Sequence, residues 1–351
     1  EHESVVVAFT DGEMIKRLSS SGYKTYVIAY KGFFHLGLVK RIYQILKAEE
    51  IELVHAHGTK ACLNALCAAL IAGVKVVYTV HGWSFHDGQS SLYFKARKFV
   101  ESWLVKNVDK TIVVSNSNLN DAKGFDGDFT VIQNGIDTVR FNPKNVIGVN
   151  RGHYQLDNAD FIIASIARLT HQKGPLVLIQ AFSEVVKVIP NAKLLFVGGG
   201  ELEEAAKAEV ANLKLEGKVR FADFSGSVAE IYKAIDLFVL PSLWEGFSLS
   251  LLEALAMECP VICSDYPSNT EIVKHKETGL VFPVSDAKAL ANVIIWAHSN
   301  PESVAQYVRT AAEIVRNNYD FSRVLHDNQL VYREMTRLVH PVSKELSPVH
   351  V

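Results

Sequence analysis

Short runs of Val, Ile, Leu and Phe alternate with longer segments of helical periodicity, such as 200–215, along the whole chain. Near-continuous apolar runs are typical of strands covered on both faces, and their alternation with helices favours parallel sheets. We therefore predict twelve strands, within residues 4–10, 24–30, 53–58, 75–82, 110–116, 129–135, 161–169, 193–199, 218–224, 237–242, 260–265 and 279–283.

A segment rich in Asn, Gly and Pro, residues 141–160, separates the first six predicted strands from the last six. It predicts an N-terminal domain over 1–145 and a C-terminal domain over 146–319, with a final helix at 320–338 that completes the first domain. The predicted fold class is α/β, with two doubly wound parallel-sheet, Rossmann-like domains. Because such sheets bind ligands beyond the carboxyl ends of their strands, we expect the two domains to face a central cleft.

The composition narrows the function classes. The 351 residues are 48% hydrophobic and carry a formal net charge of -2, which gives no global attraction for nucleic acid. The four cysteines match neither a paired metal knuckle nor a disulfide framework, and they favour buried thiols in a reducing, cytoplasmic setting. The longest apolar run, 65–74, is half the length of a membrane span.

The stretch 241–265 carries two glutamates, Glu245 and Glu253, between a predicted strand and a predicted helix. We expect Glu245 in the loop and Glu253 near the start of the helix. A helix N-terminus after Gly and Ser suits a phosphate, and a carboxylate beside it suits the vicinal hydroxyls of a ribose or sugar. The alternative is that both glutamates only complement the helix dipole. The stretch alone leaves both interpretations open.

A second strand-to-helix turn carries two cations. Arg168 and Lys173 follow the predicted strand at 161–169, and cations beyond the carboxyl end of a strand suit a diphosphate. The alternative is an ordinary solvated loop. A third turn contains three glycines, 198–200, which alone indicate only a tight turn.

These motifs together resemble the retaining glycosyltransferases of family four, which have the GT-B fold. The matching segments are "RLTHQKG", "VGGGE", "EGFSLSLLEALA", "VIQNGID" and "TGLVFP", in the order and spacing of the family. The resemblance covers nearly the whole chain.

The resemblance implies a nucleoside diphosphate sugar as donor and a saccharide or lipid-linked acceptor, in polysaccharide or glycolipid assembly. Arg168 and Lys173 would neutralise the diphosphate, and Glu253 would hold the ribose. Glu245 and the backbone of Gly246, Phe247 and Ser248 would contact the transferred sugar and its phosphate. Gly199 and Leu249 would also belong to the donor-binding site. Ser248 stands where many members have glycine. His81 matches the histidine that reaches the donor sugar.

The same resemblance implies a retaining hexosyltransferase that needs no metal, since cations and a helix N-terminus can stabilise the leaving diphosphate. Members begin with a further strand and a Gly-rich loop, so we expect such a segment upstream of this chain in the native protein. A nucleotide-sugar epimerase on the same scaffold and a catalytically silent nucleotide-sugar-binding protein are the alternatives.

Three further segments have competing interpretations. His55 and His57 lie on one side of a strand and could hold a metal, although no Cys or acidic cluster completes the site. The segment 268–271 reads as a capping box and also lies where relatives carry a donor-side glutamate. The helix predicted at 92–107 is either packed on the first sheet or lies on an anionic membrane, which would place the protein at the inner face of that membrane.

Overall fold

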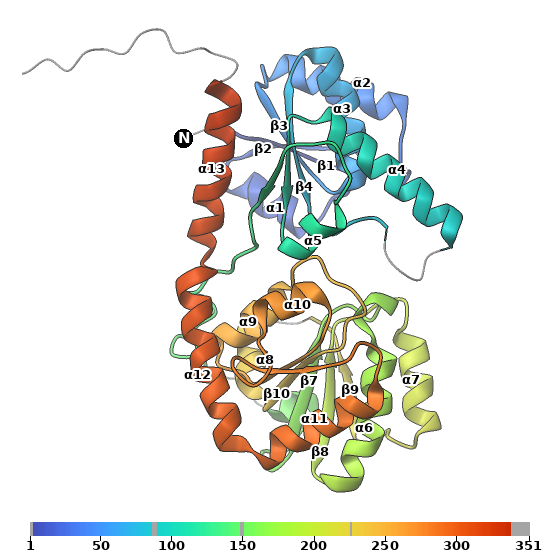
Figure 1. The fold of residues 1–351 in the computed structure, drawn as a ribbon, viewed down its shortest axis with the longest axis vertical. Coiled ribbons are helices and arrows are strands. Elements are labelled where there is room, and N and C mark those ends of the chain that lie inside the picture. The colour runs from blue at the N-terminus through green and yellow to red at the C-terminus, as the bar shows by residue number, and fades with distance from the viewer. Residues whose placement is uncertain (1–2, 86–89, 148–150, 225–226, 338–351) are drawn as a thin grey trace, which may run out of the picture. The chain divides into compact units, whose positions relative to one another are not determined.

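The computed structural model describes residues 3–85, 90–147, 151–224 and 227–337 (Figure 1). The contacts group the chain into two compact units. The N-terminal unit comprises Glu1–Val113, Ala122–Val131 and Gln329–Val351, and the C-terminal unit comprises Val114–Asp121 and Ile132–Asn328. The domain limits at 145 and 320, suggested by linker composition, remain a prediction.

The N-terminal unit contains two parallel sheets. One pairs β1 (Val5–Ala8) with β2 (Lys24–Val27), and the other has the order β3-β4-β5-β6. No ladder joins the two sheets among the described residues, whereas the pattern of apolar runs suggested one sheet. The remaining elements are α1 (Glu13–Ser20), α2 (Leu36–Ala48), β3 (Leu53–His57), α3 (Thr59–Ala72), β4 (Lys75–Val80), α4 (Ser91–Asn107), β5 (Lys110–Val113) and β6 (Phe129–Val131).

The C-terminal unit has one six-stranded parallel sheet in the order β12-β11-β10-β7-β8-β9. Its elements are α5 (Asn116–Asp121), β7 (Phe161–Ile166), α6 (Pro175–Val188), β8 (Ala192–Val197), α7 (Glu203–Asn212), β9 (Val219–Ala222), α8 (Val228–Ala234), β10 (Leu237–Leu240), α9 (Leu249–Ala256), β11 (Val261–Ser264), α10 (Pro267–Ile272), β12 (Leu280–Phe282), α11 (Ala287–Ser299) and α12 (Pro301–Asn318). The last helix, α13 (Phe321–Arg337), begins in this unit and ends in the other. Each of the twelve predicted strand segments contains a strand, so the predicted α/β class is confirmed.

Two hydrophobic cores cover the two faces of the six-stranded sheet. Successive residues of β7 alternate between them, with Ile162 in one core and Ile163 in the other. This alternation is what a doubly wound sheet requires, because side chains point to opposite faces along a strand. The strand order reverses between β7 and β10, which makes that point the switch at which such sheets bind ligands.

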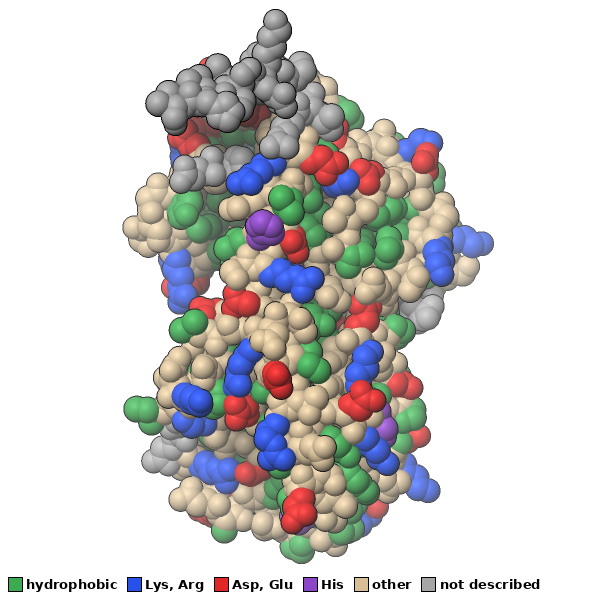
Figure 2. Space-filling model, turned by 60° about the vertical axis from the view of Figure 1, so that its left-hand side comes forward, with side chains coloured by type: hydrophobic (Ala, Val, Ile, Leu, Met, Phe, Trp, Pro, Cys, Tyr) green, Lys and Arg blue, Asp and Glu red, His purple; other side chains and the backbone are tan. Residues whose placement is uncertain are grey.

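The described part of the chain has no helix that is both long and apolar enough to cross a membrane. On the face shown in Figure 2, Lys and Arg side chains are interspersed with Asp and Glu. That face therefore presents no field of a single sign.

Candidate active site

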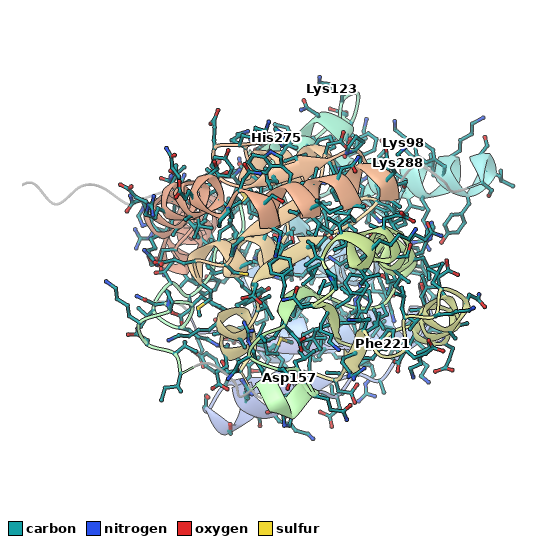
Figure 3. All side chains as sticks on the ribbon, turned by 90° about the horizontal axis from the view of Figure 1, so that it is seen from below. Lys98, Lys123, Asp157, Phe221, His275 and Lys288 are labelled. Atoms are coloured by element: carbon teal, nitrogen blue, oxygen red, sulfur yellow. The ribbon has the colours of Figure 1, made fainter. Side chains whose placement is uncertain are left out.

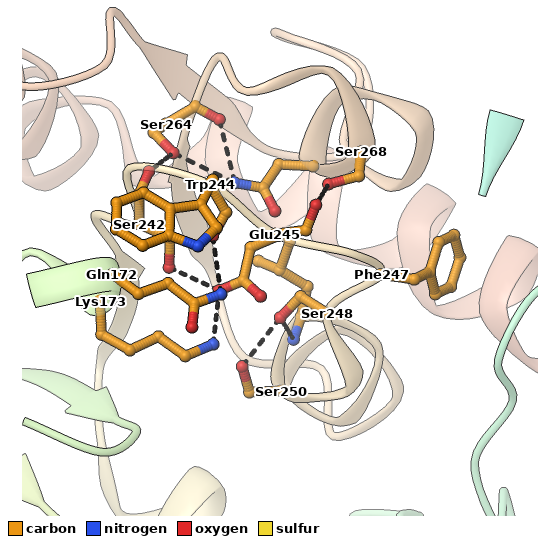
Figure 4. A network of polar contacts seen from close by, with 12 residues as sticks. Gln172, Lys173, Ser242, Trp244, Glu245, Phe247, Ser248, Ser250, Ser264 and Ser268 are labelled. Carbon is orange, nitrogen blue, oxygen red and sulfur yellow. Dashed lines mark hydrogen bonds and ion pairs between the residues drawn. The ribbon is translucent and has the colours of Figure 1, made fainter. Parts of the chain in front are cut away.

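The loop that follows β10 is built around the buried carboxylate of Glu245. Pro241 ends the strand because it has no N–H for the ladder. The Ser242 Oγ atom then donates to Glu245 Oε1 at 2.7 Å, and Lys173 forms an ion pair with the same oxygen (Figure 4). The Glu245 side chain is 7% exposed and that of Lys173 is 18% exposed. A buried charge needs partners of this kind.

Lys173 reaches this carboxylate from the loop that follows β7. The backbone N–H of Leu243 donates to the Gln172 carbonyl at 2.8 Å, and the Gln172 side chain donates to the Trp244 carbonyl at 3.0 Å. Gly174 then closes the turn at φ +61, where an added Cβ would lie 2.3 Å from the Pro241 carbonyl oxygen. The β7 and β10 loops are thus held together at the switch point of the sheet, 72 residues apart in sequence.

Arg168, from the same β7 loop, has a different environment. Its side chain is exposed and makes no hydrogen bond or ion pair with any residue that the structure describes. The two cations predicted to act together therefore differ, since Lys173 already has a carboxylate partner and Arg168 is available to a ligand.

The helix α9 begins directly after the Glu245 loop. Ser248 is its N-cap and accepts a hydrogen bond from the Leu251 N–H at 3.4 Å. Within the described residues, the N–H groups of Gly246, Phe247, Leu249 and Ser250 have no acceptor. Four free donors at the positive end of a helix form a ready anion site.

Two further contacts fix the path of this loop. The Ser268 Oγ atom donates to the Glu245 carbonyl oxygen at 3.0 Å, and the Asn134 side chain donates to the Phe247 carbonyl oxygen at 3.4 Å. The Phe247 ring is buried against Tyr319. These contacts leave the loop little freedom to turn its N–H groups elsewhere.

Glu253 is the fifth residue of α9, so it lies outside the first turn. The prediction that Glu245 lies in the loop is confirmed, whereas Glu253 lies in the second turn of α9 and not at its start. The dipole alternative fails because no acidic residue lies in the first turn. The Tyr232 hydroxyl donates to Glu253 Oε2 at 3.3 Å. Burial raises the pKa of Glu253 to about 7, against the lowering effects of the Tyr232 hydrogen bond and the Arg140 charge.

The three glycines after β8 pack against the Arg168 loop. Gly198 has φ +118, and an added Cβ would lie 2.6 Å from the Ala167 carbonyl oxygen. At Gly200 an added Cβ would lie 2.4 Å from the Leu169 carbonyl oxygen. Gly199 accepts a hydrogen bond from the Leu169 N–H at 3.0 Å. This turn thus brings the backbone of the β8 loop next to the β7 loop.

In the N-terminal unit, His81 directly follows β4. Its Nε2 atom lies 3.0 Å from Nδ1 of His57, the last residue of β3, and the two rings stack. His55, two residues before His57, contacts Thr79 Oγ1 through Nε2 at 2.6 Å and the Tyr332 hydroxyl through Nδ1. Desolvation lowers the pKa of all three, to about 3 for His55 and about 4 for His57.

The contacts of His55 and His57 decide between the interpretations of this pair. Three of the four ring nitrogens already have hydrogen-bond partners in the protein. Among the described residues, no group of three or more His, Cys, Asp or Glu side chains is arranged to hold a metal. The structure therefore favours a neutral, hydrogen-bonded pair over a metal pair.

The capping box predicted at 268–271 is wrong. The helix α10 starts at Pro267 with Tyr266 as N-cap, so Ser268 lies two residues past the N-cap position, inside the helix. The Glu271 carboxylate instead accepts hydrogen bonds from the N–H groups of Asn116 at 3.0 Å and Ser117 at 2.6 Å, at the start of α5. Its acidic side chain thus stabilises the N-terminus of a different helix.

Sequence reasoning missed Ser242, Ser268 and the His57–His81 contact. Ser242 directly follows Pro241, which ends the strand, and this position could have indicated a residue of the site. Ser268 and His57 gave none, because their partners lie 23 and 24 residues away.

The sequence matches two protein families and several known proteins, all of them glycosyltransferases or glycosyltransferase families. The family described as Glycosyltransferase Family 4 matches residues 1–140, and the family Glycosyl transferases group 1 matches residues 148–314. A UDP-Gal:alpha-D-GlcNAc-diphosphoundecaprenol alpha-1,3-galactosyltransferase of Escherichia coli is 30% identical over 276 residues, which is 72% of this chain and 68% of that protein. The putative glycosyltransferase EpsD of Bacillus subtilis is 28% identical over 277 residues, 76% of this chain and 73% of that protein.

Solved structures show the same fold. Anabaena HepE in complex with UDP and glucose aligns with a TM-score of 0.80 at 22% identity, over 95% of this chain and 91% of that one. A glycosyltransferase of Rickettsia africae aligns with a TM-score of 0.81 at 22% identity, over 96% and 91%. The fold is that of the GT-B glycosyltransferases. The chain belongs to glycosyltransferase family 4, and it is a glycosyltransferase.

Proposed function

We propose that the protein is a retaining, metal-independent hexosyltransferase that takes its sugar from a nucleoside diphosphate donor. The observation that carries this proposal is the grouping at the β7–β10 switch point. Four free N–H groups at the start of α9, the exposed Arg168 and the Lys173–Glu245 pair converge there from two loops, those that follow β7 and β10. Cations and oriented N–H groups suit a diphosphate, whose charge grows as the sugar departs.

In this proposal the bond between the sugar C1 atom and the diphosphate oxygen breaks, and a bond from the acceptor oxygen to C1 forms on the same face. The acceptor hydroxyl proton passes to the departing phosphate oxygen, so no protein nucleophile is required. Arg168 and the α9 N–H groups stabilise the new negative charge. Lys173 acts beside them, held in place by Glu245, whose carboxylate is already engaged by two partners.

Glu253 would accept hydrogen bonds from the ribose hydroxyls, and Gly199 would let the β8 loop approach the donor. Gly246, Phe247, Ser248 and Leu249 would contact the diphosphate through their backbone. His81 would contact the transferred sugar from the N-terminal unit. Loss of a single charge-assisted contact of this kind costs about 1.5–3 kcal/mol.

We further propose that the acceptor is a saccharide or lipid-linked hydroxyl in polysaccharide or glycolipid assembly, at the cytoplasmic face of a membrane. Support comes from the E. coli relative, whose name gives an undecaprenol-linked acceptor. Binding measurements with UDP, GDP and ADP sugars would identify the nucleobase of the donor. We propose no nucleic-acid partner, because the net charge of -2 gives no global attraction for nucleic acid.

A thermal-shift screen with these nucleotides and their sugars tests donor binding, since a ligand at 100 times its Kd stabilises by about 2.7 kcal/mol. Product analysis then separates the activities. A transferase consumes donor only with acceptor, an epimerase alters donor alone, and a silent binding protein leaves it unchanged. Activity retained in EDTA and an α product from an α donor are the expected results. Loss of activity in EDTA or an inverted product would contradict the proposal.

A further inference from the structure

The helix α4 exposes three large apolar side chains, while it buries its acidic side chain and two other apolar ones, Leu104 and Val105. Leu92, Phe99 and Trp103 are 80%, 72% and 37% exposed. Spacings of seven and four residues place the three on one face, within about 40° of arc at 100° per residue. Figure 1 shows α4 extending from the N-terminal unit. An ordinary surface helix exposes its acidic side chains and buries its large apolar ones.

The inner face of α4 explains why this arrangement is stable. Glu101 is fully buried, and its carboxylate accepts hydrogen bonds from Thr59 Oγ1 at 2.7 Å and the Tyr78 hydroxyl at 3.0 Å. Leu104 and Val105 are buried beside it. The second half of the helix thus anchors it to the N-terminal unit. These buried contacts fix which face of α4 points inward, so the face with Leu92, Phe99 and Trp103 must point to solvent.

The first part of α4 overhangs the edge of the sheet at which His57 and His81 lie. Thr59 is the first residue of α3 and follows His57 after a single glycine. Because Glu101 is bonded at Thr59, the ten residues before it, about 15 Å of helix, extend beyond that point. The apolar stripe therefore begins past the carboxyl edge of the N-terminal sheet.

The loop before α2 adds apolar side chains to the same region. Phe33, Phe34 and Leu36 are 37%, 42% and 75% exposed. The Arg97 guanidinium carbon lies 4.9 Å from the centre of the Phe33 ring and 4.8 Å from that of Tyr93, which joins the loop to the flank of α4, about 100–140° around the helix from Leu92. Apolar side chains gathered in this way mark an interaction site.

The charge of both segments has one sign. Residues 90–107 carry four cations, Lys95, Arg97, Lys98 and Lys106, and their single acidic residue is the buried Glu101. Of the four, Lys106 forms an exposed ion pair with Asp126 at 3.0 Å. Residues 31–48 carry four further Lys and Arg residues and no acidic residue. Lys98 is labelled on α4 in Figure 3. Aromatic and Leu side chains bordered by Lys and Arg suit the interface of an anionic bilayer.

We propose that Leu92, Phe99 and Trp103 of α4, together with Phe33, Phe34 and Leu36, dock the N-terminal unit on an anionic lipid bilayer. The apolar side chains enter the headgroup region and the cations contact lipid phosphates. The docked edge is the edge of His57 and His81, so a lipid-linked hydroxyl would be presented there. This last step rests on the proposed glycosyl transfer, whereas bilayer binding does not.

Co-flotation of the full chain with vesicles tests the docking. We expect binding to phosphatidylglycerol–phosphatidylcholine vesicles and much weaker binding to pure phosphatidylcholine. Leu92→Ser with Phe99→Ser should reduce binding at least tenfold. Lys95→Gln with Lys106→Gln should reduce it roughly 25-fold at low salt, at about fivefold for each cation. The matched controls are Val188→Ser with Leu325→Ser, exposed on other helices, and Lys187→Gln with Lys214→Gln.

Quenching by brominated lipid locates the contact. Fluorescence of the wild type should be quenched on vesicles, and Trp103→Phe should lose most of that quenching. Equal flotation of the wild type and Leu92→Ser/Phe99→Ser would overturn the proposal. A dimer in sedimentation that this variant dissociates, without vesicle binding, would also overturn it and identify a second copy as the partner.

The two proposals fail separately. The stripe variants should keep the thermal shift with sugar nucleotides and their turnover of a water-soluble acceptor, and should lose turnover of a vesicle-embedded acceptor. Vesicle binding without any nucleotide shift would contradict the proposed donor and leave the docking intact. Equal turnover of embedded acceptor by wild type and stripe variant would contradict the presentation step.

Discussion

The Nδ1 atom of His57 lies 3.0 Å from the Nε2 atom of His81, across the ends of two neighbouring strands. Desolvation lowers the pKa of both rings, so both are neutral at pH 7 and one hydrogen is shared along this contact. The contact thereby couples the tautomer of His81 to that of His57. A hydrogen bond of this kind fixes the orientation of a histidine ring, and in the proposed function His81 is the ring that contacts the sugar.

Substitution of His57 by Phe should therefore lower turnover about tenfold, because it keeps a stacked ring and removes the nitrogen that orients His81. His57→Asn, whose amide can occupy the Nδ1 position, should recover most of the activity. The measurement is kcat and KM with saturating acceptor at pH 7.5. Equal turnover by the Phe and Asn variants would show that His57 has no role in orienting His81.

The stability of the protein should fall in mild acid, in part through His55. The pKa of His55 is lowered from 6.5 to about 3 by desolvation, then by the charges of His57 and His81. Between these values the unfolded chain binds a proton and the folded chain does not. The contribution of His55 is complete above pH 6.5 and decreases as the pH falls toward 3.

His55→Asn should reduce the slope of unfolding free energy against pH by about 1 kcal/mol per pH unit between pH 6 and 4.5. Urea unfolding at four pH values measures this slope. His326→Asn, at an exposed histidine on α13, serves as the matched substitution against which the change in slope is compared. A slope for His55→Asn equal to that of the wild type would contradict the assignment.

The Lys173–Glu245 pair should be strongly coupled, because removal of Lys173 leaves a buried carboxylate with Ser242 as its remaining partner. We expect Lys173→Met to cost about 3 kcal/mol and Lys173→Met with Glu245→Gln to cost less. The exposed pair Lys187–Glu184 provides the control, with an expected coupling below about 0.5 kcal/mol. Strictly additive effects of Lys173→Met and Glu245→Gln in urea unfolding would exclude the coupling.

Gly174 should not accept a side chain. It has φ +61, and an added Cβ would lie 2.3 Å from the Pro241 carbonyl oxygen, so Gly174→Ala must displace the β7 or β10 loop. We expect a loss of at least about 1–2 kcal/mol and weaker binding of the donor nucleotide. Gly217→Ala, with no atom within 4 Å of the added Cβ, should change stability by less than about 0.5 kcal/mol. Thermal unfolding with and without nucleotide compares the two variants.

The strands were predictable because each has a local sequence pattern of its own. The run 193–199 is apolar over most of the length of a buried strand and ends in glycines, and β8 overlaps it over 193–197. The polar contacts of the site have no local sequence pattern, because their partners are far apart in the chain. Lys173 and Glu245 are 72 residues apart, and Glu271 bonds to Ser117, 154 residues before it. Their pairing depends on which strands become neighbours.

The orientation of α4 is a second feature that the local sequence does not determine. The pattern of 92–107 predicted an amphipathic helix, and α4 is confirmed there. Which side faces inward is decided by Glu101, whose partners Thr59 and Tyr78 come from other elements. Periodicity alone does not show which apolar side chains face the core: Leu104 and Val105 are buried beside the Glu101 carboxylate, and Leu92 and Phe99 face outward.

Donor binding should depend on pH through Glu253. Burial raises the pKa of its carboxyl to about 7, so at pH 6 most of the free protein carries Glu253 in the neutral form. If the carboxylate accepts the ribose hydroxyls, binding must first release this proton. Affinity for a sugar nucleotide should then rise up to tenfold per pH unit below pH 7 and level off above it. Glu253→Gln should bind more weakly at pH 8 and lose this dependence, while its affinity for pyrophosphate at pH 8 stays within about twofold of the wild type. Calorimetric titration at pH 6, 7 and 8 measures both effects, and a Gln variant that keeps the wild-type pH dependence would remove Glu253 from the ribose site.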